Sequence, residues 1–404
     1  MPSVAIIGSR GYPSYYGGFE TLVRRLAPHL ADAGWDVTVY GRPGLKTDDP
    51  DLDPRVRSRV TAGIESKKFS TLSYGLTSTV DAFVRKPDVA LVLNCAVGYW
   101  LPILKARGIP SVVNVDGIEW ERGKWGRSAR AVFRTGAKLT ARYADELVFD
   151  ARAIGAYWRE NFGRDGVFIP YGGDPSGELP VEPGLEHGKY VLIVARFVAE
   201  NTINEFVDAA QQLAADHDVV FVGSSGYGGE IEERVGRLAA SNPRVHWFGH
   251  VKDDRRLHSL WQHAGAYFHG HSVGGTNPAL VQAMALGAPI VARDTVYNRE
   301  VLGGSGLLVP PEPDRIAEAA DRLVRSSELR ALLGGNALAR AADAYTWQGV
   351  CERYESALWA LATRTAGSSG RPVPQVPASA AADPVAAEPV SAGPVPADDS
   401  VEVR

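Results

Sequence analysis

The sequence is poor in cysteine and methionine, with two of each among its 404 residues. Cys95 and Cys351 lie far apart, and their spacing fits neither a disulfide framework nor a pair of metal ligands. The longest apolar stretch, residues 89–104, falls short of the roughly 20 residues that a membrane-spanning helix needs. The first residues lack the basic and apolar segments of a secretory signal. These absences predict a cytoplasmic protein with buried, reduced thiols.

The chain also lacks a strong excess of either charge. Its net charge is -4, which gives no reason to expect a nucleic-acid partner. The Gly-x-Gly-x-x-Gly fingerprint of dinucleotide-binding enzymes is missing after the first predicted strand, so a dehydrogenase is not expected. We expect no bound metal ion and no cofactor.

Short runs of Val, Ile and Leu recur along the chain, separated by segments with helical periodicity. Continuous apolar runs are typical of parallel strands covered on both faces, and strands that alternate with helices indicate βαβ units. Since the chain exceeds the size of one hydrophobic core, we predict two doubly wound, Rossmann-like α/β domains. The predicted strands are residues 4–7, 37–40, 89–93, 111–115, 147–149 and 167–169, and then 190–194, 219–222, 245–248, 266–268, 289–292 and 307–309.

Composition sets the predicted domain boundaries. Residues 176–188 are polar and rich in Pro and Gly, as is typical of a linker, so the domains are assigned to residues 1–175 and 189–346. A C-terminal helix is predicted over residues 347–365. We predict a disordered tail over residues 366–404, because this Pro-rich segment cannot bury enough surface to offset the loss of chain entropy.

A glycine-rich segment follows the first predicted strand. The letters GSRG occupy residues 8–11, and Gly17 and Gly18 then precede a helix marked by leucines at 22, 26 and 30. Glycines let a ligand approach the backbone, and the start of a helix offers free N–H groups and a partial positive charge. We interpret Gly17 and Gly18 as a phosphate site, with a plain tight turn as the alternative.

A second glycine-rich loop, HGHSVGGTNP, covers residues 269–278. Asn277 is a favourable N-cap and Pro278 fits the first helical position, so a helix should begin here and end near Gly287. The loop follows a predicted strand, and open α/β sheets bind ligands at the carboxyl ends of their strands. Because both domains carry this arrangement, we predict one anionic ligand in a cleft between them.

Two charged residues lie at predicted strand ends. Arg196 ends the first strand of the second domain, where a guanidinium can bind a diphosphate through two hydrogen bonds. Asp116 follows the strand at residues 111–115 and is a candidate to orient a sugar or to move a proton. The alternatives are a surface ion pair for Arg196 and a turn or cap for Asp116.

The segment at residues 125–143 predicts an amphipathic helix with a basic stripe. One face carries Arg127, Arg130, Arg134, Lys138 and Arg142, and the apolar face carries Trp125, Val132, Leu139 and Tyr143. The stripe exceeds what solubility requires. We interpret it as a contact for anionic lipid headgroups or a lipid-diphosphate acceptor, with a solvated face as the alternative.

Five ordered motifs resemble one family: IIGSRGYPSYYGGFETLVRRLAPHL, VNVDGIEWERGKW, ELVFDARAI, IPYGGD and HGHSVGGTNPALVQAMALGAPIVARD. They are similar to the retaining glycosyltransferases of family 4, which have the GT-B fold, and within it to the bacterial rhamnosyltransferase-type subgroup. The resemblance covers residue 1 to about residue 362.

The resemblance implies roles for the singled-out residues. Gly17 and Gly18 would hold the donor phosphates and border the acceptor site, and Asp116 would lie near the transferred sugar. Arg196 would bind the diphosphate. The remaining donor-binding residues would be Gly274, Gly275, Thr276, Asn277, Pro278 and Gln282, and the residues facing the acceptor or the membrane would be Arg10, Arg127, Arg130, Arg134 and Lys138. The helix near Trp347 would cross back onto the first domain.

Three positions depart from the family pattern. Asn201 stands where the family usually has a lysine. Gly274 and Gln282 stand where it has two glutamates, of which the second normally holds the ribose of the nucleotide. A glutamine still accepts and donates hydrogen bonds, but it carries no charge.

The resemblance implies that a sugar, with rhamnose as a candidate, passes from a nucleotide-diphosphate donor to a glycan or lipid-linked acceptor with retention at the anomeric carbon. The transition state would be oxocarbenium-like, and the enzyme would mainly stabilise the leaving diphosphate. Two alternatives stay open: a nucleotide-sugar 2-epimerase of the same fold, and a nucleotide-sugar binding protein with weak catalysis. The expected location is the cytoplasm, with peripheral contact at the inner face of the membrane.

Overall fold

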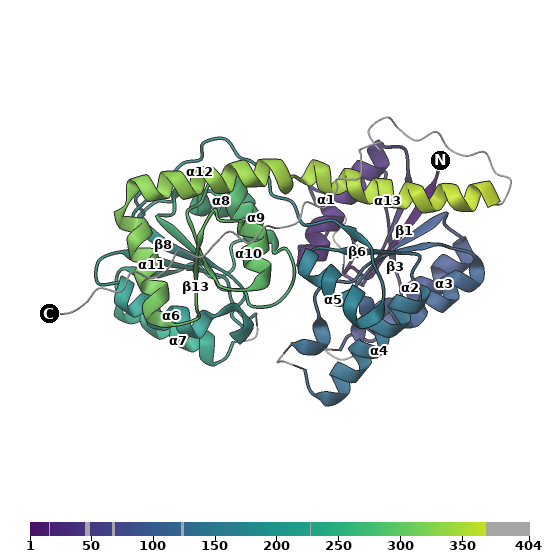
Figure 1. Cartoon of the computed structure of the whole chain (residues 1–404), viewed down its shortest axis with the longest axis horizontal. Coiled ribbons are helices and arrows are strands. Elements are labelled where there is room, and N and C mark those ends of the chain that lie inside the picture. The colour runs from purple at the N-terminus through teal and green to yellow at the C-terminus, as the bar shows by residue number, and fades with distance from the viewer. Residues whose placement is uncertain (16, 45–48, 67–68, 123–124, 227, 369–404) are drawn as a thin grey trace, which may run out of the picture.

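The computed structural model describes residues 1–15, 17–44, 49–66, 69–122, 125–226 and 228–368. These residues form two parallel sheets, each covered by helices, that lie side by side with a long helical segment running along both (Figure 1). The predicted architecture of two doubly wound α/β units is therefore confirmed.

The first sheet contains the six predicted strands and one more. Its strands are β1 (Ser3–Ile7), β2 (Asp36–Gly41), β3 (Arg57–Val60), β4 (Val89–Leu93), β5 (Ser111–Asn114), β6 (Glu146–Phe149) and β7 (Val167–Phe168). They pair in parallel in the order β3-β2-β1-β4-β5-β6-β7. The additional strand, β3, is an exposed edge strand with the sequence RSRV, so it lacks the apolar run that predicts the others.

Helices connect these strands in sequence. They are α1 (Gly18–Asp32), α2 (Ser70–Arg85), α3 (Leu101–Arg107), α4 (Arg127–Tyr143) and α5 (Arg152–Phe162), with the 3₁₀ helices η1 (Cys95–Trp100) and η2 (Glu119–Glu121). The apolar stretch at residues 89–104 therefore forms β4, η1 and the start of α3. Among the described residues, no helix is both long and apolar enough to cross a bilayer.

The second sheet consists of the six strands predicted for it. They are β8 (Tyr190–Val194), β9 (Asp218–Val222), β10 (Val245–Trp247), β11 (Ala266–His269), β12 (Ile290–Arg293) and β13 (Leu307–Val309), paired in parallel in the order β10-β9-β8-β11-β12-β13. The associated helices are η3 (Ala199–Asn201), α6 (Ile203–Leu213), α7 (Glu230–Ser241), α8 (Asp254–His263), α9 (Pro278–Ala285), α10 (Val296–Leu302), α11 (Pro313–Arg325) and α12 (Ser327–Ala344). The last helix, α13 (Trp347–Ser368), packs against the first half.

Each sheet reverses its strand order beside its first strand. In the first sheet β1 lies between β2 and β4, and in the second β8 lies between β9 and β11. Open α/β sheets bind ligands at such switch points, outside the carboxyl ends of the strands. The segments that follow β1, β8 and β11 contain most of the residues that the sequence singled out, and Asp116 follows β5.

The chain crosses between the two sheets twice, and the crossings pair with each other. Gly173 N donates to Tyr345 O at 2.8 Å, and Gly173 forms a parallel bridge with Thr346. After the return crossing, α13 packs on the first sheet's side of the molecule (Figure 1). Its Trp359 ring lies 4.8 Å from the ring of Trp35, at a steep angle.

Residues 176–188, the predicted linker, pack along α8. Glu182 forms an ion pair with Arg256 at 2.6 Å, and Leu179 N donates to Gln262 Oε1 at 2.8 Å. The domain bounds on either side stay a prediction. The predicted start of the tail is wrong by three residues, because α13 continues to Ser368; the rest of the predicted tail, residues 369–404, lies outside the described residues.

Candidate functional site

The first glycine pair lies at the carboxyl edge of the first sheet. Gly17 is extended, and α1 begins at Gly18. A Cβ added at Gly18 would lie 2.9 Å from the hydroxyl of the buried Tyr171, so the backbone of α1 approaches that ring closely. The buried Glu20 accepts the N–H of Arg10 at 2.9 Å. The loop after β1 and the start of α1 are therefore held together.

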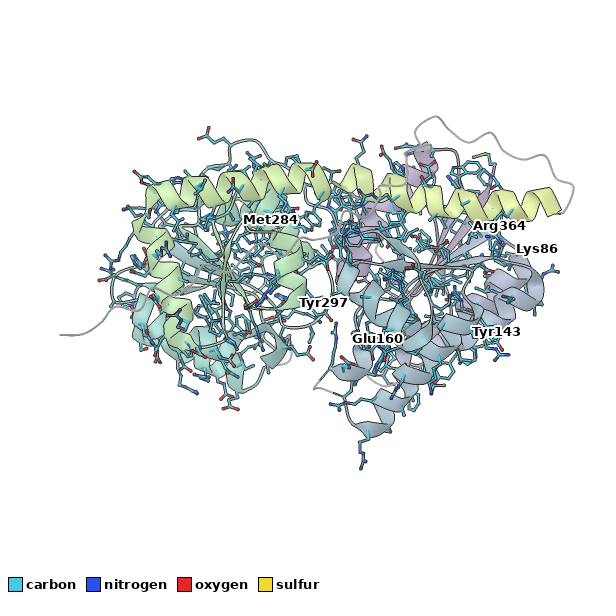
Figure 2. All side chains as sticks on the ribbon, viewed as in Figure 1. Lys86, Tyr143, Glu160, Met284, Tyr297 and Arg364 are labelled. Atoms are coloured by element: carbon cyan, nitrogen blue, oxygen red, sulfur yellow. The ribbon has the colours of Figure 1, made fainter. Side chains whose placement is uncertain are left out.

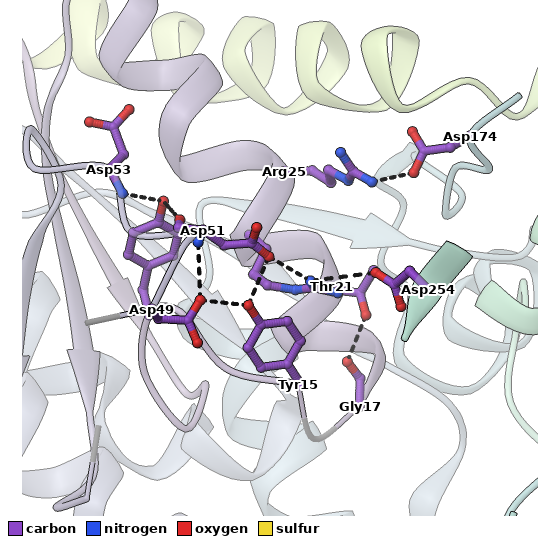
Figure 3. Close-up of polar contacts among 11 residues, drawn as sticks. Tyr15, Gly17, Thr21, Arg25, Asp49, Asp51, Asp53, Asp174 and Asp254 are labelled. Carbon is purple, nitrogen blue, oxygen red and sulfur yellow. Dashed lines mark hydrogen bonds and ion pairs between the residues drawn. The ribbon is translucent and has the colours of Figure 1, made fainter. Parts of the chain in front are cut away.

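A polar network links α1 to the second half of the molecule (Figure 3). The Tyr15 hydroxyl lies within hydrogen-bonding distance of the carboxylates of Asp49, at 2.7 Å, and Asp51, at 2.8 Å, and Arg24 pairs with Asp51 at 2.9 Å. Arg24 also lies 4.0 Å from Asp254 at the start of α8. The next residue, Arg25, pairs with Asp174 in the crossing segment. These contacts hold the segment before Gly17 and the first crossing against α1.

Two aspartates end neighbouring strands of the first sheet. Asp116 follows β5 in a left-handed conformation, with φ of 62°, and accepts a hydrogen bond from Asn94 Nδ2 at 3.3 Å. Asp150 follows β6 and is only 4% exposed. Burial, and then the charge of Asp116, raise the pKa of Asp150 well above its usual value. Sequence reasoning singled out Asp116 and missed Asp150, although Asp150 directly follows β6 and Asp116 lies two residues beyond the end of β5.

The second glycine loop, residues 274–277, enters α9 as predicted. Asn277 caps the helix by accepting the N–H of Ala279 at 3.0 Å, and Pro278 is the first helical residue. In the part of the chain that the structure describes, no acceptor takes the N–H groups of Gly274, Gly275 or Asn277. Three free N–H groups at the positive end of a helix form a site suited to an anion.

The same loop makes a close contact with the first half of the molecule. Thr276 donates its N–H, at 3.2 Å, and its hydroxyl to the carbonyl of Asp150. A Cβ added at Gly275 would collide with the Asp150 carboxyl, and one added at Gly117 would lie 3.2 Å from Gly274 Cα. The predicted cleft is thus closed at this loop. Donor binding by Thr276 stays a prediction, because both of its donors are occupied here.

Arg196 lies just beyond β8, exposed, and forms no ion pair with any described residue. Its carbonyl accepts from Nδ2 of the buried Asn201 at 2.9 Å. Asn201, where the resembling family has a lysine, therefore fixes the turn that presents Arg196.

A half-buried histidine, His271, lies on the other side of this second switch point. Burial, with the positive charges of Arg196 and Arg122, lowers the pKa of His271 to about 3. Its ring is therefore neutral and stacks on the ring of His269 with centroids 4.4 Å apart. His271 can form hydrogen bonds with a phosphate, but it adds no charge. Sequence reasoning quoted this histidine within its motif without giving it a role.

The side chain of Gln282 forms hydrogen bonds within the protein. Its Oε1 accepts from Asp174 N at 3.0 Å, and its Nε2 donates to Asp174 O at 2.8 Å. The side chain thereby binds the crossing segment to α9. The ribose contact implied by the resemblance stays a prediction.

Helix α10 adds a contact that no sequence signal indicated. Glu300 accepts the N–H groups of Arg152 at 2.7 Å and of Ala153 at 3.2 Å, so it caps α5 from the opposite half of the molecule. Tyr297, on the side of α10 nearest the first half (Figure 2), packs against the core of the first half. Such contacts depend on how the two halves meet, which local patterns do not encode.

The basic stripe lies on the outer surface of α4, where Arg127, Arg130, Arg134 and Lys138 are all exposed. The prediction of Val132 as part of the apolar inner face is wrong, because it is 39% exposed. The buried face of α4 is instead made of Gly136, Ala137 and Thr140. The helix packs beside η1, well below the crossing helix α13 (Figure 1).

Comparisons with known proteins agree with this arrangement. A family model described as "Glycosyl transferase 4-like domain" matches residues 17–172, and one described as "Glycosyl transferases group 1" matches residues 188–326. The chain is 25% identical to the MMP alpha-(1->4)-mannosyltransferase of Mycolicibacterium hassiacum, over 88% of this chain and 98% of that protein.

Two solved structures have the same fold. Sucrose-phosphate synthase from Thermosynechococcus elongatus matches with a TM-score of 0.73 and 21% identity, over 88% of this chain and 98% of that one. HepE of Anabaena, in complex with UDP-glucose, matches with a TM-score of 0.69 and 17% identity, over 89% and 100%. Since the two family models together span most of both halves, the chain belongs to the group 1 (family 4) glycosyltransferases and is a retaining, nucleotide-sugar-dependent, hexosyltransferase-type enzyme of the GT-B fold.

Proposed function

We propose that the enzyme transfers a hexose from a nucleoside-diphosphate sugar whose diphosphate binds the loop at residues 274–277 and Arg196. The observation that carries this proposal is the set of N–H groups on Gly274, Gly275 and Asn277 at the start of α9, which have no acceptor among the described residues. The exposed Arg196, whose positive charge reaches His271 just before this loop, has no ion-pair partner in the described part of the chain. Preorganised donors of this kind stabilise the negative charge that develops on a leaving diphosphate.

Asp116 is the proposed partner of the transferred sugar. It lies at the carboxyl end of β5, close enough to Asp150 for their charges to interact, and Asn94 holds its carboxylate. A carboxylate at this place orients a sugar hydroxyl and offsets the positive charge of an oxocarbenium-like transition state. Gly17 and Gly18, at the same carboxyl edge of the first sheet, are the proposed contacts of the donor phosphates and the proposed border of the acceptor site.

The nucleotide is proposed to be uridine or thymidine diphosphate. HepE, of the same fold, was solved with UDP and with UDP-glucose, whereas the subgroup resemblance favours thymidine-diphosphate rhamnose. The two nucleotides differ in a base methyl group and a ribose hydroxyl. The acceptor is proposed to be a hydroxyl of a glycan or of a lipid-linked sugar.

Turnover of a panel of nucleotide sugars tests this function. The enzyme is incubated with UDP-glucose, UDP-galactose, thymidine-diphosphate rhamnose or GDP-mannose, with and without a polyprenyl-diphosphate sugar, and the products are analysed by NMR. We expect release of the nucleoside diphosphate and a new linkage with the anomeric configuration of the donor. A donor epimerised without acceptor would instead establish the 2-epimerase alternative, and an inverted linkage would refute the mechanism.

Peripheral membrane contact is proposed for the layer formed by α2, α3 and α4. These neighbouring helices carry a single acidic residue, Asp81, and the exposed basic residues Arg85, Lys105, Arg107, Arg127, Arg130, Arg134, Lys138 and Arg142. Val80, Val84 and Val132 are exposed on the same helices. Since the whole chain has a net charge of -4, this layer is a local positive field suited to anionic lipid headgroups.

Sedimentation with anionic liposomes tests the contact. Each basic side chain near such a bilayer contributes about 1 kcal/mol, and salt screens the attraction. A variant with glutamine at the four residues of the α4 stripe should no longer sediment at low salt. The matched control replaces four exposed arginines of the second half, Arg237, Arg244, Arg255 and Arg315, and should sediment like the wild type. Equal loss in both variants would refute the assignment to α4.

A further inference from the structure

Asp150 places a buried carboxyl at the junction of the two halves. The residue is 4% exposed, and in the described part of the chain its Oδ1 has no hydrogen-bond partner. The carboxyl lies directly against the Cα of Gly275, where any side chain would collide with it. Buried polar atoms are nearly always paired, so an unpaired oxygen at this place needs an explanation.

The backbone around Asp150 is fixed to the second half from two directions. Its carbonyl accepts both the N–H and the hydroxyl of Thr276, and Glu300 accepts the N–H groups of Arg152 and Ala153 at the start of the following helix, α5. The position of the loop at residues 274–277 therefore depends on that of Asp150. While Thr276 is anchored in this way, the N–H groups of Gly275 and Asn277 on either side of it have no acceptor among the described residues.

Several groups from different elements lie close enough to Asp150 for their charges to interact. They are Asp116 after β5, Arg122 after η2, Tyr171 after β7, Tyr297 and Glu300 on α10, and Tyr354 on α13. Burial and the neighbouring carboxylates, which outweigh the single guanidinium, raise the pKa of Asp150. The closed arrangement thus favours a protonated carboxyl, which can donate a hydrogen bond and does not repel a diphosphate.

Resting on the proposed donor site, we propose that Asp150 is a positioning residue for the donor, whose side chain seats the loop at residues 274–277 so that its free N–H groups meet the diphosphate. The carboxyl acts across the junction through its contact with Gly275, where the absence of a side chain admits it, while the backbone carbonyl of Asp150 holds Thr276. The two halves then close on the donor more readily when Asp150 is protonated.

The test compares binding of UDP, with dTDP and GDP in parallel, to four variants at a series of pH values by calorimetry. Asp150→Asn mimics the neutral acid and should bind within about threefold of the wild type at low pH, while Asp150→Ala should bind about fivefold to tenfold more weakly. The Gly275→Ala variant should lose at least as much affinity for UDP as Asp150→Ala. The double variant Asp150→Ala/Gly275→Ala should recover part of that loss, because the added methyl group no longer meets a carboxyl.

The pH profile separates positioning from a merely structural role. The raised pKa means that the closed, protonated state is favoured at low pH and is lost as pH rises through that pKa, so wild-type affinity should fall with rising pH. Asp150→Asn should remove this dependence, and uridine, which lacks phosphates, should bind all variants equally. Melting temperatures identify any variant that fails to fold. If Asp150→Ala or Gly275→Ala fails to fold, the pH profile of Asp150→Asn alone tests the positioning role.

Two outcomes overturn the inference. One is Asp150→Ala binding UDP as tightly as the wild type, and the other is Asp150→Asn keeping the wild-type pH dependence. If no nucleoside diphosphate binds the wild type, the proposed function itself fails, and the inference fails with it. Unchanged affinity in the Asp150 variants, with a wild type that does bind, refutes the positioning role alone.

Discussion

The substitution Gln282→Glu changes one atom in the contact that fixes the first crossing between the sheets. Glutamine accepts from Asp174 N at 3.0 Å and donates to Asp174 O at 2.8 Å. Glutamate keeps the first bond, but it sets two oxygens against each other in place of the second. Losing that bond and leaving a half-buried carbonyl unpaired costs about 1–3 kcal/mol. The resembling family carries glutamate here, so the expected loss is specific to this structure.

The effect should reach the donor site because Asp174 belongs to the crossing. It also pairs with Arg25, and the adjacent Gly173 bonds to the return crossing at Tyr345. We expect a melting temperature lower by about 2–4 °C for each kcal/mol lost, together with weaker binding of UDP. The carboxylate beside a carbonyl has a raised pKa, so lowering the pH should protonate it, restore the donor and reduce the deficit.

Gln262→Glu is the matched control for this prediction. Gln262 makes the same pair of contacts with the linker, accepting from Leu179 N at 2.8 Å and donating to Gly177 O at 3.2 Å. It should lose stability without losing affinity for UDP. A Gln282→Glu enzyme with unchanged melting temperature and tighter UDP binding would refute the reasoning, because residue 282 would then face the ribose.

Three further predictions follow from single contacts. Burial alone would raise the pKa of Glu355, but hydrogen bonds from His29 and Trp359 lower it. The ionised Glu355 therefore stabilises the fold above the pKa of an unfolded glutamate, and this stabilisation is lost as the pH falls through the lowered pKa of the folded state. Thermal unfolding of Glu355→Gln should lack this pH dependence. Asn277→Ala removes the cap of α9 and should lower the free energy of unfolding by about 1 kcal/mol in urea titrations. Gly18→Ala should destabilise the protein by about 1–3 kcal/mol through overlap with the Tyr171 hydroxyl, and adding Tyr171→Phe should restore part of the loss; additive effects would exclude the contact.

The strands were predictable because they are buried on both faces. β4 and β8 have the predicted bounds, since each is a continuous apolar run. β3 carries two arginines on an exposed edge and leaves no such signal. Val132 was misplaced because helical spacing cannot tell which apolar residues face the sheet. α4 lies so close to η1 that a Cβ added at Gly136 would lie 2.9 Å from Cys95 O, so only small residues fit there.

Only those residues of the candidate site that lie at the ends of predicted strands could be found from the sequence. The rule that ligands bind at the carboxyl ends of parallel strands found Asp116 and Arg196, and the same rule applied to β6 would have found Asp150. The contacts of Thr276 and Gly275 with Asp150 join residues more than a hundred positions apart. They depend on the angle at which the halves meet, so no local pattern predicts them.

Binding of UDP and of uridine to the wild type and to Arg196→Ala tests the central claim, that a diphosphate binds beside the loop at residues 274–277. Arg196 has no ion-pair partner among the described residues, so its removal leaves no unpaired carboxylate behind. A charge-assisted contact is worth about 1.5–3 kcal/mol, which is about tenfold to 150-fold in affinity. The account predicts this loss for UDP and unchanged affinity for uridine. Equal losses for both ligands, or none for UDP, would contradict it.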